Sequence, residues 1–404
     1  MTARSGARAA LLVALAAIWS VAAYLLWQSK VPAPLRLAHL DPRAYFTAAQ
    51  LHASASFSSF NDWTWWGSTA AQVVGLAAYA RYGARWARES AAGPIGTGML
   101  LGMLGFALVW ALQLPFGVAE LWWQRRHHVS QVGYADYLFG NWFALGGQFV
   151  FLSFALAIVM GLARRLRRSW WAFAAPAFVG LALLFAFITP YLTPVHRLHD
   201  QQLRAIAAGL ERKEGVGRVP VDVQAVHDVT SLPNAEAMGI GPSRRVVLWD
   251  TLLDGRFSTG ELKIVLAHEI GHLARHHIWK DVGWYALFAF PGTFLLALAA
   301  RRRGGMGELA AIPLSLLVLV VLGLLALPLQ NAISRHMEAE ADWMSLRTTH
   351  DPRDATALFR RFVPTTLDEP DPSTVDYLLQ ENHPTIMQRI AMAKAYATSA
   401  AQSP

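Results

Sequence analysis

Long apolar stretches without charged residues alternate with polar segments along this chain of 404 residues. Each apolar stretch is close to the roughly 20 residues that an α-helix needs to cross the hydrocarbon core of a bilayer. The pattern therefore predicts a bundle of seven membrane-spanning helices. Their approximate bounds are Ala9–Trp27, Trp63–Ala80, Thr97–Ala119, Asn141–Ala163, Trp170–Leu192, Val282–Ala300 and Leu309–Gln330.

Two of these stretches allow a second interpretation. The first also fits a signal peptide, because Arg4 and Arg8 precede its apolar core. No convincing small-residue cleavage site follows, so we predict a membrane span. The second, Trp63–Ala80, is the weakest of the seven, since it is short and contains Ser, Thr and Gln.

Two polar segments, residues 196–281 and 331–404, are long enough to build a water-facing domain. The first contains "VPVDVQAVHDV", which alternates as a β-strand does, and "RRVVLWDTLL", a short apolar strand. Ser258 or Thr259 then caps a predicted helix that runs from Glu261. We therefore expect a mostly α-helical fold with a small β-sheet beside the membrane.

The composition supports a membrane protein and limits its chemistry. Hydrophobic residues make up 54% of the chain and charged residues 15%, which is typical of an integral membrane protein. The net charge of +8 would also suit a nucleic-acid-binding protein, but the basic runs lie between apolar spans, so we expect no nucleic-acid partner. The chain has no cysteine, so any metal must be held by His, Asp or Glu.

A metal-binding motif lies in "IVLAHEIGHLARHH". His268 and His272 are four residues apart, so on a helix they share one face and offer two imidazoles to one ion. Zinc suits such a site and keeps one coordination position open for catalysis. Glu269 would lie beside the metal and take a proton from zinc-bound water. We expect His276 and His277 to form hydrogen bonds near the membrane surface rather than to bind the metal.

A third zinc ligand is predicted in "SRHMEAEAD". Glu338 and Asp342 are four residues apart and share a helical face, whereas Glu340 points elsewhere. Glu338 would complete a His, His, Glu site, and Asp342 would accept a hydrogen bond from a ligating histidine. Taken alone, the stretch also fits a solvated acidic helix face. Both ligand-bearing segments run within about 12–15 Å of helix into predicted spans, so we expect the zinc, and its substrate, at the membrane surface.

These motifs together resemble the integral-membrane gluzincin metallopeptidases of the CaaX prenyl protease 1 type. The matching features are the layout of five spans before and two after the HExxH segment, "VLWDTLL" before "LAHEIGH", "SRHMEAEAD", and "NHPTIMQRI". The resemblance implies one zinc per chain and divides the chain into four parts. These are a five-span region 1–195, a zinc-protease domain 196–281, a two-span hairpin 282–330, and a C-terminal part of the protease domain 331–404.

The resemblance also assigns roles to residues outside the zinc ligands. It implies that His383 and Arg389 contact the substrate or stabilise the oxyanion. It places Asn234 and Ala235 at a strand edge that pairs with an extended peptide. Glu236 stands where the family usually has an aromatic residue.

We therefore expect a membrane-embedded zinc metalloendopeptidase that cleaves peptides or membrane-associated proteins. One alternative is an HtpX-like quality-control protease, although that family usually has only two spans before its motif. A non-proteolytic membrane sensor and a transporter with a structural metal are alternatives from other classes. The sensors carry an appended receptor domain, and a transporter does not explain the full set of catalytic residues.

The distribution of arginines predicts the orientation in a bacterial cell membrane. Loops rich in Arg lie on the side that the N-terminus shares with residues 81–88, 164–168 and 301–303. Short loops rich in Lys and Arg face the cytoplasm. The zinc domain is therefore expected on the extracytoplasmic side.

Overall fold

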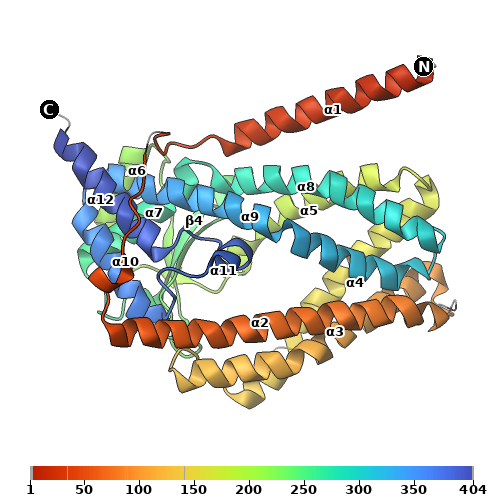
Figure 1. The fold of residues 1–404 in the computed structure, drawn as a ribbon, viewed down its shortest axis with the longest axis horizontal. Coiled ribbons are helices and arrows are strands. Elements are labelled where there is room, and N and C mark those ends of the chain that lie inside the picture. Colours follow the sequence, from red (N-terminus) through yellow and green to blue (C-terminus); the bar gives the residue numbers. More distant parts are fainter. Residues whose placement is uncertain (1–2, 34, 87, 89, 141, 403–404) are drawn as a thin grey trace.

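The computed structural model describes residues 3–33, 35–86, 88, 90–140 and 142–402, and it is mostly α-helical (Figure 1). Long helices lie side by side over most of its length, and the short strands gather at one end (Figure 1). The helices are α1 (Ala3–Trp27), α2 (Ala48–Tyr82), α3 (Gly93–Arg126), α4 (Trp142–Leu166), α5 (Trp170–Leu192), α6 (Gln201–Glu214), α7 (Thr259–Ala274), α8 (His277–Ala300), α9 (Ala311–Thr349), α10 (Pro352–Thr366), α11 (Thr374–Leu379) and α12 (Ile386–Gln402).

Among the described residues, five helical segments are long and apolar enough to cross a membrane. They are Gly93–Arg126, Asp136–Leu166, Trp170–Leu192, His277–Arg303 and Ala311–Thr349. These segments make the chain an integral membrane protein, but the predicted count of seven spans is not confirmed.

The other two predicted spans are helical but differ in length or polarity. The apolar part of α1 is short, covering Val13–Trp27. Helix α2 is continuous over 35 residues, yet it carries polar side chains that face other parts of the protein. Asp62 accepts a hydrogen bond from Gln380 at 3.1 Å, and Asn61 lines a cavity that α2 shares with α3. Inward-facing polar residues lower the hydropathy of a helix without exposing polar groups to lipid.

The small sheet has mixed topology. Its strands are β1 (His196–Arg197), β2 (Val221–Gln224), β3 (Ala235–Met238) and β4 (Arg245–Trp249), in the order β1-β2-β4-β3. Strands β2 and β4 are parallel, and the two outer pairs are antiparallel. Because β3 is the last strand in this order, it pairs along one edge only within the described sheet. Its second edge has no strand partner among the described residues.

One hydrophobic core holds the zinc-motif helix between the sheet and the C-terminal helices. Leu266 and Ile270 of α7 are fully buried, with Leu248 from β4 and Ile390 from α12 in the same cluster. Phe46, from the predicted N-terminal membrane region, also lies in this core. The two polar segments of the chain therefore fold into one unit, to which the residues before α2 contribute.

Helix α7 begins where the sequence predicts it. Ser258 is the N-cap, and its hydroxyl accepts a hydrogen bond from the amide of Glu261 at 3.2 Å. The Glu261 carboxylate accepts in return from the amide of Ser258 at 2.7 Å, which completes a capping box. Arg361 also binds Glu261, at 2.8 Å, and so ties the start of α7 to α10.

Candidate active site

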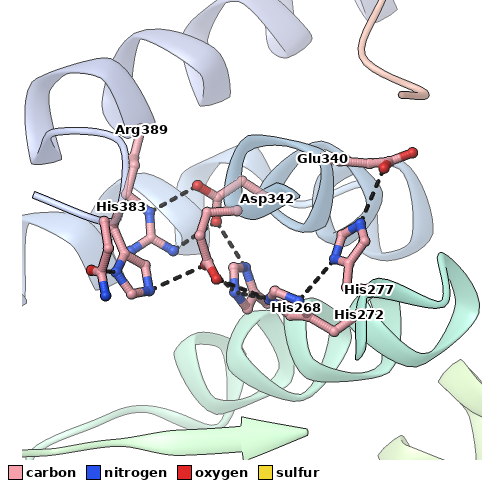
Figure 2. A network of polar contacts seen from close by, with 9 residues as sticks. His268, His272, His277, Glu340, Asp342, His383 and Arg389 are labelled. Atoms are coloured by element: carbon pink, nitrogen blue, oxygen red, sulfur yellow. Dashed lines mark hydrogen bonds and ion pairs between the residues drawn. The ribbon is translucent and has the colours of Figure 1, made fainter. Parts of the chain in front are cut away.

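Helices α7 and α9 pack closely and bring the two predicted ligand motifs together. A glycine makes this approach possible. A Cβ at Gly271 would lie 3.3 Å from Cβ of Met344 and 3.6 Å from backbone atoms of Ala341, so a side chain here would push the helices apart. The two histidines of α7 therefore face the acidic side chains of α9 (Figure 2).

Three potential metal-binding side chains converge at this crossing. His268 Nε2 lies 3.0 Å from His272 Nε2 and 3.1 Å from a carboxylate oxygen of Glu338, whose other oxygen lies 3.5 Å from His272 Nε2. Ligand atoms at about 2.0–2.1 Å from a tetrahedral zinc ion are separated by about 3.3 Å. The spacing of these three groups therefore fits zinc.

The donor chemistry of the cluster agrees with its spacing. His268 Nδ1 lies 2.9 Å from Asp342 Oδ1, and a carboxylate can only accept, so Nδ1 carries a proton. Nε2 lies 3.1 Å from Glu338, to which it donates in the absence of a metal, and it is the nitrogen that would present a lone pair to a bound ion. Burial opposes a charged imidazole, but the hydrogen bonds to Asp342 and Glu338 raise the pKa of His268 to about 10. The cluster therefore favours a positive charge at this position, which a metal ion also supplies.

Asp342 is held in turn by Arg389. The guanidinium Nε and Nη2 atoms lie 2.8 and 2.7 Å from the two carboxylate oxygens, and the group stacks over Phe359 at 4.3 Å. Burial alone would lower the pKa of Arg389, but the Asp342 carboxylate raises it above its ordinary value. A two-pronged pair of this kind fixes orientation as well as charge. The first role of Arg389 in this structure is therefore to hold the carboxylate that orients His268.

His383 comes from the loop before α12 and reaches the same cluster. Its Nε2 lies 3.2 Å from Glu338, and its Nδ1 lies 2.7 Å from the side-chain oxygen of Asn382. The side chain is 48% exposed, so one side of it remains open to a substrate. This exposure distinguishes His383 from the buried histidine His268.

A small cavity opens beside the three converging side chains. Glu269 lines it next to His268 and is buried. The cavity also exposes Asn234 and Ala235 at the start of β3, together with His383 and Arg389. Seven of the nine sequence-predicted site residues therefore line one space, although they come from five separate segments of the chain. The other two, His272 and Glu338, contact His268 beside it.

A second carboxylate lies near Glu269. Burial, and then the charge of Glu269, raise the pKa of Glu236 on β3. Both effects disfavour the charged form of Glu236. The departure from the family pattern at this position thus adds a polar group to the site.

His277 and Glu340 lie near the cluster but were not predicted as part of it. His277 is buried and its Nδ1 lies 2.9 Å from His272 Nδ1, while its Nε2 lies 3.1 Å from Glu340 (Figure 2). His277 thus forms hydrogen bonds and lies outside the three converging side chains, and its depth relative to the membrane surface stays a prediction. The neighbouring His276 is exposed. Helical periodicity could not find His277, because α7 ends at Ala274 and the chain turns before α8 begins.

Comparisons with known proteins agree with this geometry. Residues 197–397 match the model of "Peptidase family M48". The uncharacterized metalloprotease YhfN of Bacillus subtilis is 27% identical over 261 residues, which cover 61% of this chain and 61% of YhfN. A protease HtpX homolog of Leuconostoc citreum is 31% identical over 184 residues, covering 39% of this chain and 62% of the homolog. The chain thus spans about three fifths of the length of these relatives.

A eukaryotic relative and a solved structure extend the similarity. CAAX prenyl protease 1 of Saccharomyces cerevisiae is 34% identical over 122 residues, covering 29% of this chain and 25% of that protein. The crystal structure of S. mikatae Ste24p has the same fold, with a TM-score of 0.69 and 18% identity over 93% of this chain and 96% of that chain. Residues 197–397 belong to peptidase family M48, and the chain has the fold of S. mikatae Ste24p.

Proposed function

We propose that this chain is a membrane zinc metalloendopeptidase that hydrolyses peptide bonds of peptides or membrane-associated proteins. The observation that carries the proposal is the convergence of His268, His272 and Glu338 beside Glu269. These three side chains would hold one zinc ion. Zinc, when bound, supplies a Lewis acid that lowers the pKa of water and polarises a carbonyl group.

The residues around the cavity have separate tasks in this proposal. Glu269 takes a proton from the attacking water and returns it to the leaving amine. His383, with its exposed imidazole, donates a hydrogen bond to the oxygen that gains charge in the transition state. Arg389 adds positive charge at the same wall of the cavity while it holds Asp342. The free edge of β3 at Asn234 and Ala235 aligns the substrate backbone.

The position of the site suggests where its substrates are. Glu338 lies on α9, the helix that continues into the span beginning at Ala311, and α8 starts five residues after His272. The cavity is therefore lined in part by α9, a helix that is long and apolar enough to enter the membrane. We propose that a substrate held at the bilayer reaches it more readily than a soluble one. The match to CAAX prenyl protease 1 favours a peptide with a lipidated end, and the match to HtpX homologs favours an unfolded membrane protein.

Peptide cleavage by the detergent-purified chain tests this function. The assay compares a fluorogenic peptide that carries a lipid anchor, the same peptide without the anchor, and an unfolded membrane protein. We expect the anchored peptide to be cleaved, cleavage to stop after chelation, and zinc to restore it. Preference for the unfolded protein would favour the HtpX-like alternative. No cleavage of any substrate by zinc-loaded protein would contradict the proposal.

We also propose that the zinc domain faces away from the cytoplasm of a bacterial cell. The basis is the run of arginines at the opposite end of the spans, as in Arg164–Arg168 and Arg301–Arg303. The cysteine-free chain permits single-cysteine labelling of intact cells. Cysteine at Ser399 should react with an impermeant reagent and cysteine at Ser169 should not. The reverse pattern would overturn the orientation.

A further inference from the structure

We propose that His277 and Glu340 form a relay that orients the zinc ligand His272, and that the chain just after α1 completes this relay. The inference rests on the proposed zinc site. It concerns residues that would not touch the metal or the substrate, so they are positioning residues.

The relay begins at a carboxylate that is completely buried. Glu340 is 0% exposed, and both of its oxygens accept hydrogen bonds. Oε1 accepts from Arg275 Nε at 2.8 Å and from the backbone amide of Lys30 at 2.8 Å. Oε2 lies 2.9 Å from Lys280 Nζ and 3.1 Å from His277 Nε2. A buried carboxylate with this many donors remains ionised and holds a fixed position.

Glu340 determines the tautomer of His277. Because a carboxylate can only accept, His277 Nε2 must carry the proton in the 3.1 Å contact. Arg275 and Lys280 carry two positive charges against the single negative charge of Glu340. A neutral His277 therefore avoids a third positive charge beside this carboxylate. In a neutral imidazole with its proton on Nε2, Nδ1 is an acceptor.

His277 in turn determines the tautomer of His272. The two Nδ1 atoms are 2.9 Å apart, and since His277 accepts, His272 must donate. The proton of His272 is then on Nδ1, and its Nε2 presents a lone pair toward His268 Nε2 and Glu338. This is the tautomer that a metal-binding imidazole needs. The two zinc-motif histidines are therefore oriented differently: His268 by Asp342 directly, and His272 by Glu340 through an intervening imidazole (Figure 2).

A break between two helices places His277 in this position. The backbone of His276 is left-handed, with φ of +57°, so the chain turns between Ala274 and the start of α8. After this turn the His277 ring lies edge-on to that of His272, with centroids 4.8 Å apart. A continuous helix would not align residues five positions apart in this way.

The end of α1 covers the far side of the relay. Lys280 donates to the backbone oxygen of Gln28 at 2.9 Å, in addition to its contact with Glu340. His336 donates to the backbone oxygen of Trp27 at 2.7 Å, and the two rings stack 4.0 Å apart. With the amide of Lys30 on Glu340, these contacts connect the first helix of the chain to the ligand set of the metal.

Zinc dissociation constants of the full-length protein test the relay, and they can be measured by competition with a chelator of known affinity. We expect His277→Ala to weaken zinc binding by roughly 10–100-fold, the range for loss of an outer hydrogen-bond partner. His277→Asn should recover most of the affinity, because its side-chain oxygen lies where Nδ1 lies and can accept from His272. His277→Gln should stay weak, because its amide reaches Glu340 but leaves His272 Nδ1 without an acceptor.

The controls separate this role from a general effect on folding. His276→Asn changes the adjacent exposed histidine, tolerates a left-handed backbone and should bind zinc as the wild type does. Thermal unfolding temperatures identify variants that lose zinc because they are unstable. If His277→Ala does not fold, the comparison of His277→Asn with His277→Gln still tests the relay, because both side chains are polar amides. Equal zinc affinity of the Asn and Gln variants, or wild-type affinity of the Ala variant, would overturn the relay. A wild-type protein that binds no zinc would overturn the zinc site and the relay together.

Discussion

Replacing Glu269 with Gln is expected to lower peptide cleavage by roughly 10²–10⁴-fold, the range for loss of a general acid–base group. The physical reason is that an amide cannot take a proton from water, whereas it fills the same volume. Glu269 is buried in the wall of the cavity and is absent from the three converging metal-binding side chains. The variant should therefore keep stoichiometric zinc. Turnover is measured with the anchored peptide, and zinc by elemental analysis of the same sample.

A matched control tests whether the effect depends on position. Glu308→Gln makes the same chemical change in an exposed turn between α8 and α9, and cleavage should stay at the wild-type rate. Cleavage by Glu269→Gln within a few-fold of the wild type would show that another group acts as the base. Glu236, a partly buried carboxyl whose pKa is raised by the charge of Glu269, would then be the first residue to change.

Replacing Glu338 with Ala is expected to remove both zinc and activity. Glu338 supplies the one carboxylate of the converging set, and the two histidines that remain do not make up the three protein ligands of a catalytic zinc site. We expect the zinc dissociation constant to rise by more than about 100-fold, beyond the range for an outer hydrogen-bond partner. Bound zinc after dialysis should fall from one ion per chain to nearly none.

The contrast between Glu338 and its neighbour on α9 makes this test specific. Glu340 is two residues away and binds a different group of side chains, namely Arg275, His277 and Lys280. Glu340→Gln should therefore weaken zinc far less than Glu338→Ala does. Stoichiometric zinc in the dialysed Glu338→Ala protein would exclude Glu338 as a ligand.

Local periodicity was sufficient to predict the centre of the site. Four-residue spacing placed His268 beside His272, and Glu338 beside Asp342, on helices that the structure contains as α7 and α9. The N-cap at Ser258 and the strand before α7 also followed from short sequence patterns. The meeting of α7 with α9 was predicted from the need for a third zinc ligand and from the family resemblance, since nothing local connects residues 70 positions apart.

The features that sequence reasoning missed depend on contacts between distant segments. Helix α2, which contains the weakest of the predicted spans, is not among the five described segments that are apolar enough to cross a membrane. Asp62 of α2 binds Gln380 in the C-terminal region, and hydropathy alone cannot tell such an inward side chain from one that faces lipid. Periodicity could not predict the contact of His277 with His272, because a two-residue break separates α7 from α8. The amide of Lys30 reaches Glu340 from 310 residues away, and no local pattern reports such a contact.

Anomalous diffraction at the zinc absorption edge, from crystals of the full-length protein, tests the central claim most directly. The account predicts one zinc peak per chain, with His268 Nε2, His272 Nε2 and a Glu338 oxygen each about 2.0–2.1 Å away. Glu269 should lie beside the ion without binding it. A peak held by other residues, or no peak at this crossing in zinc-loaded crystals, would contradict the account.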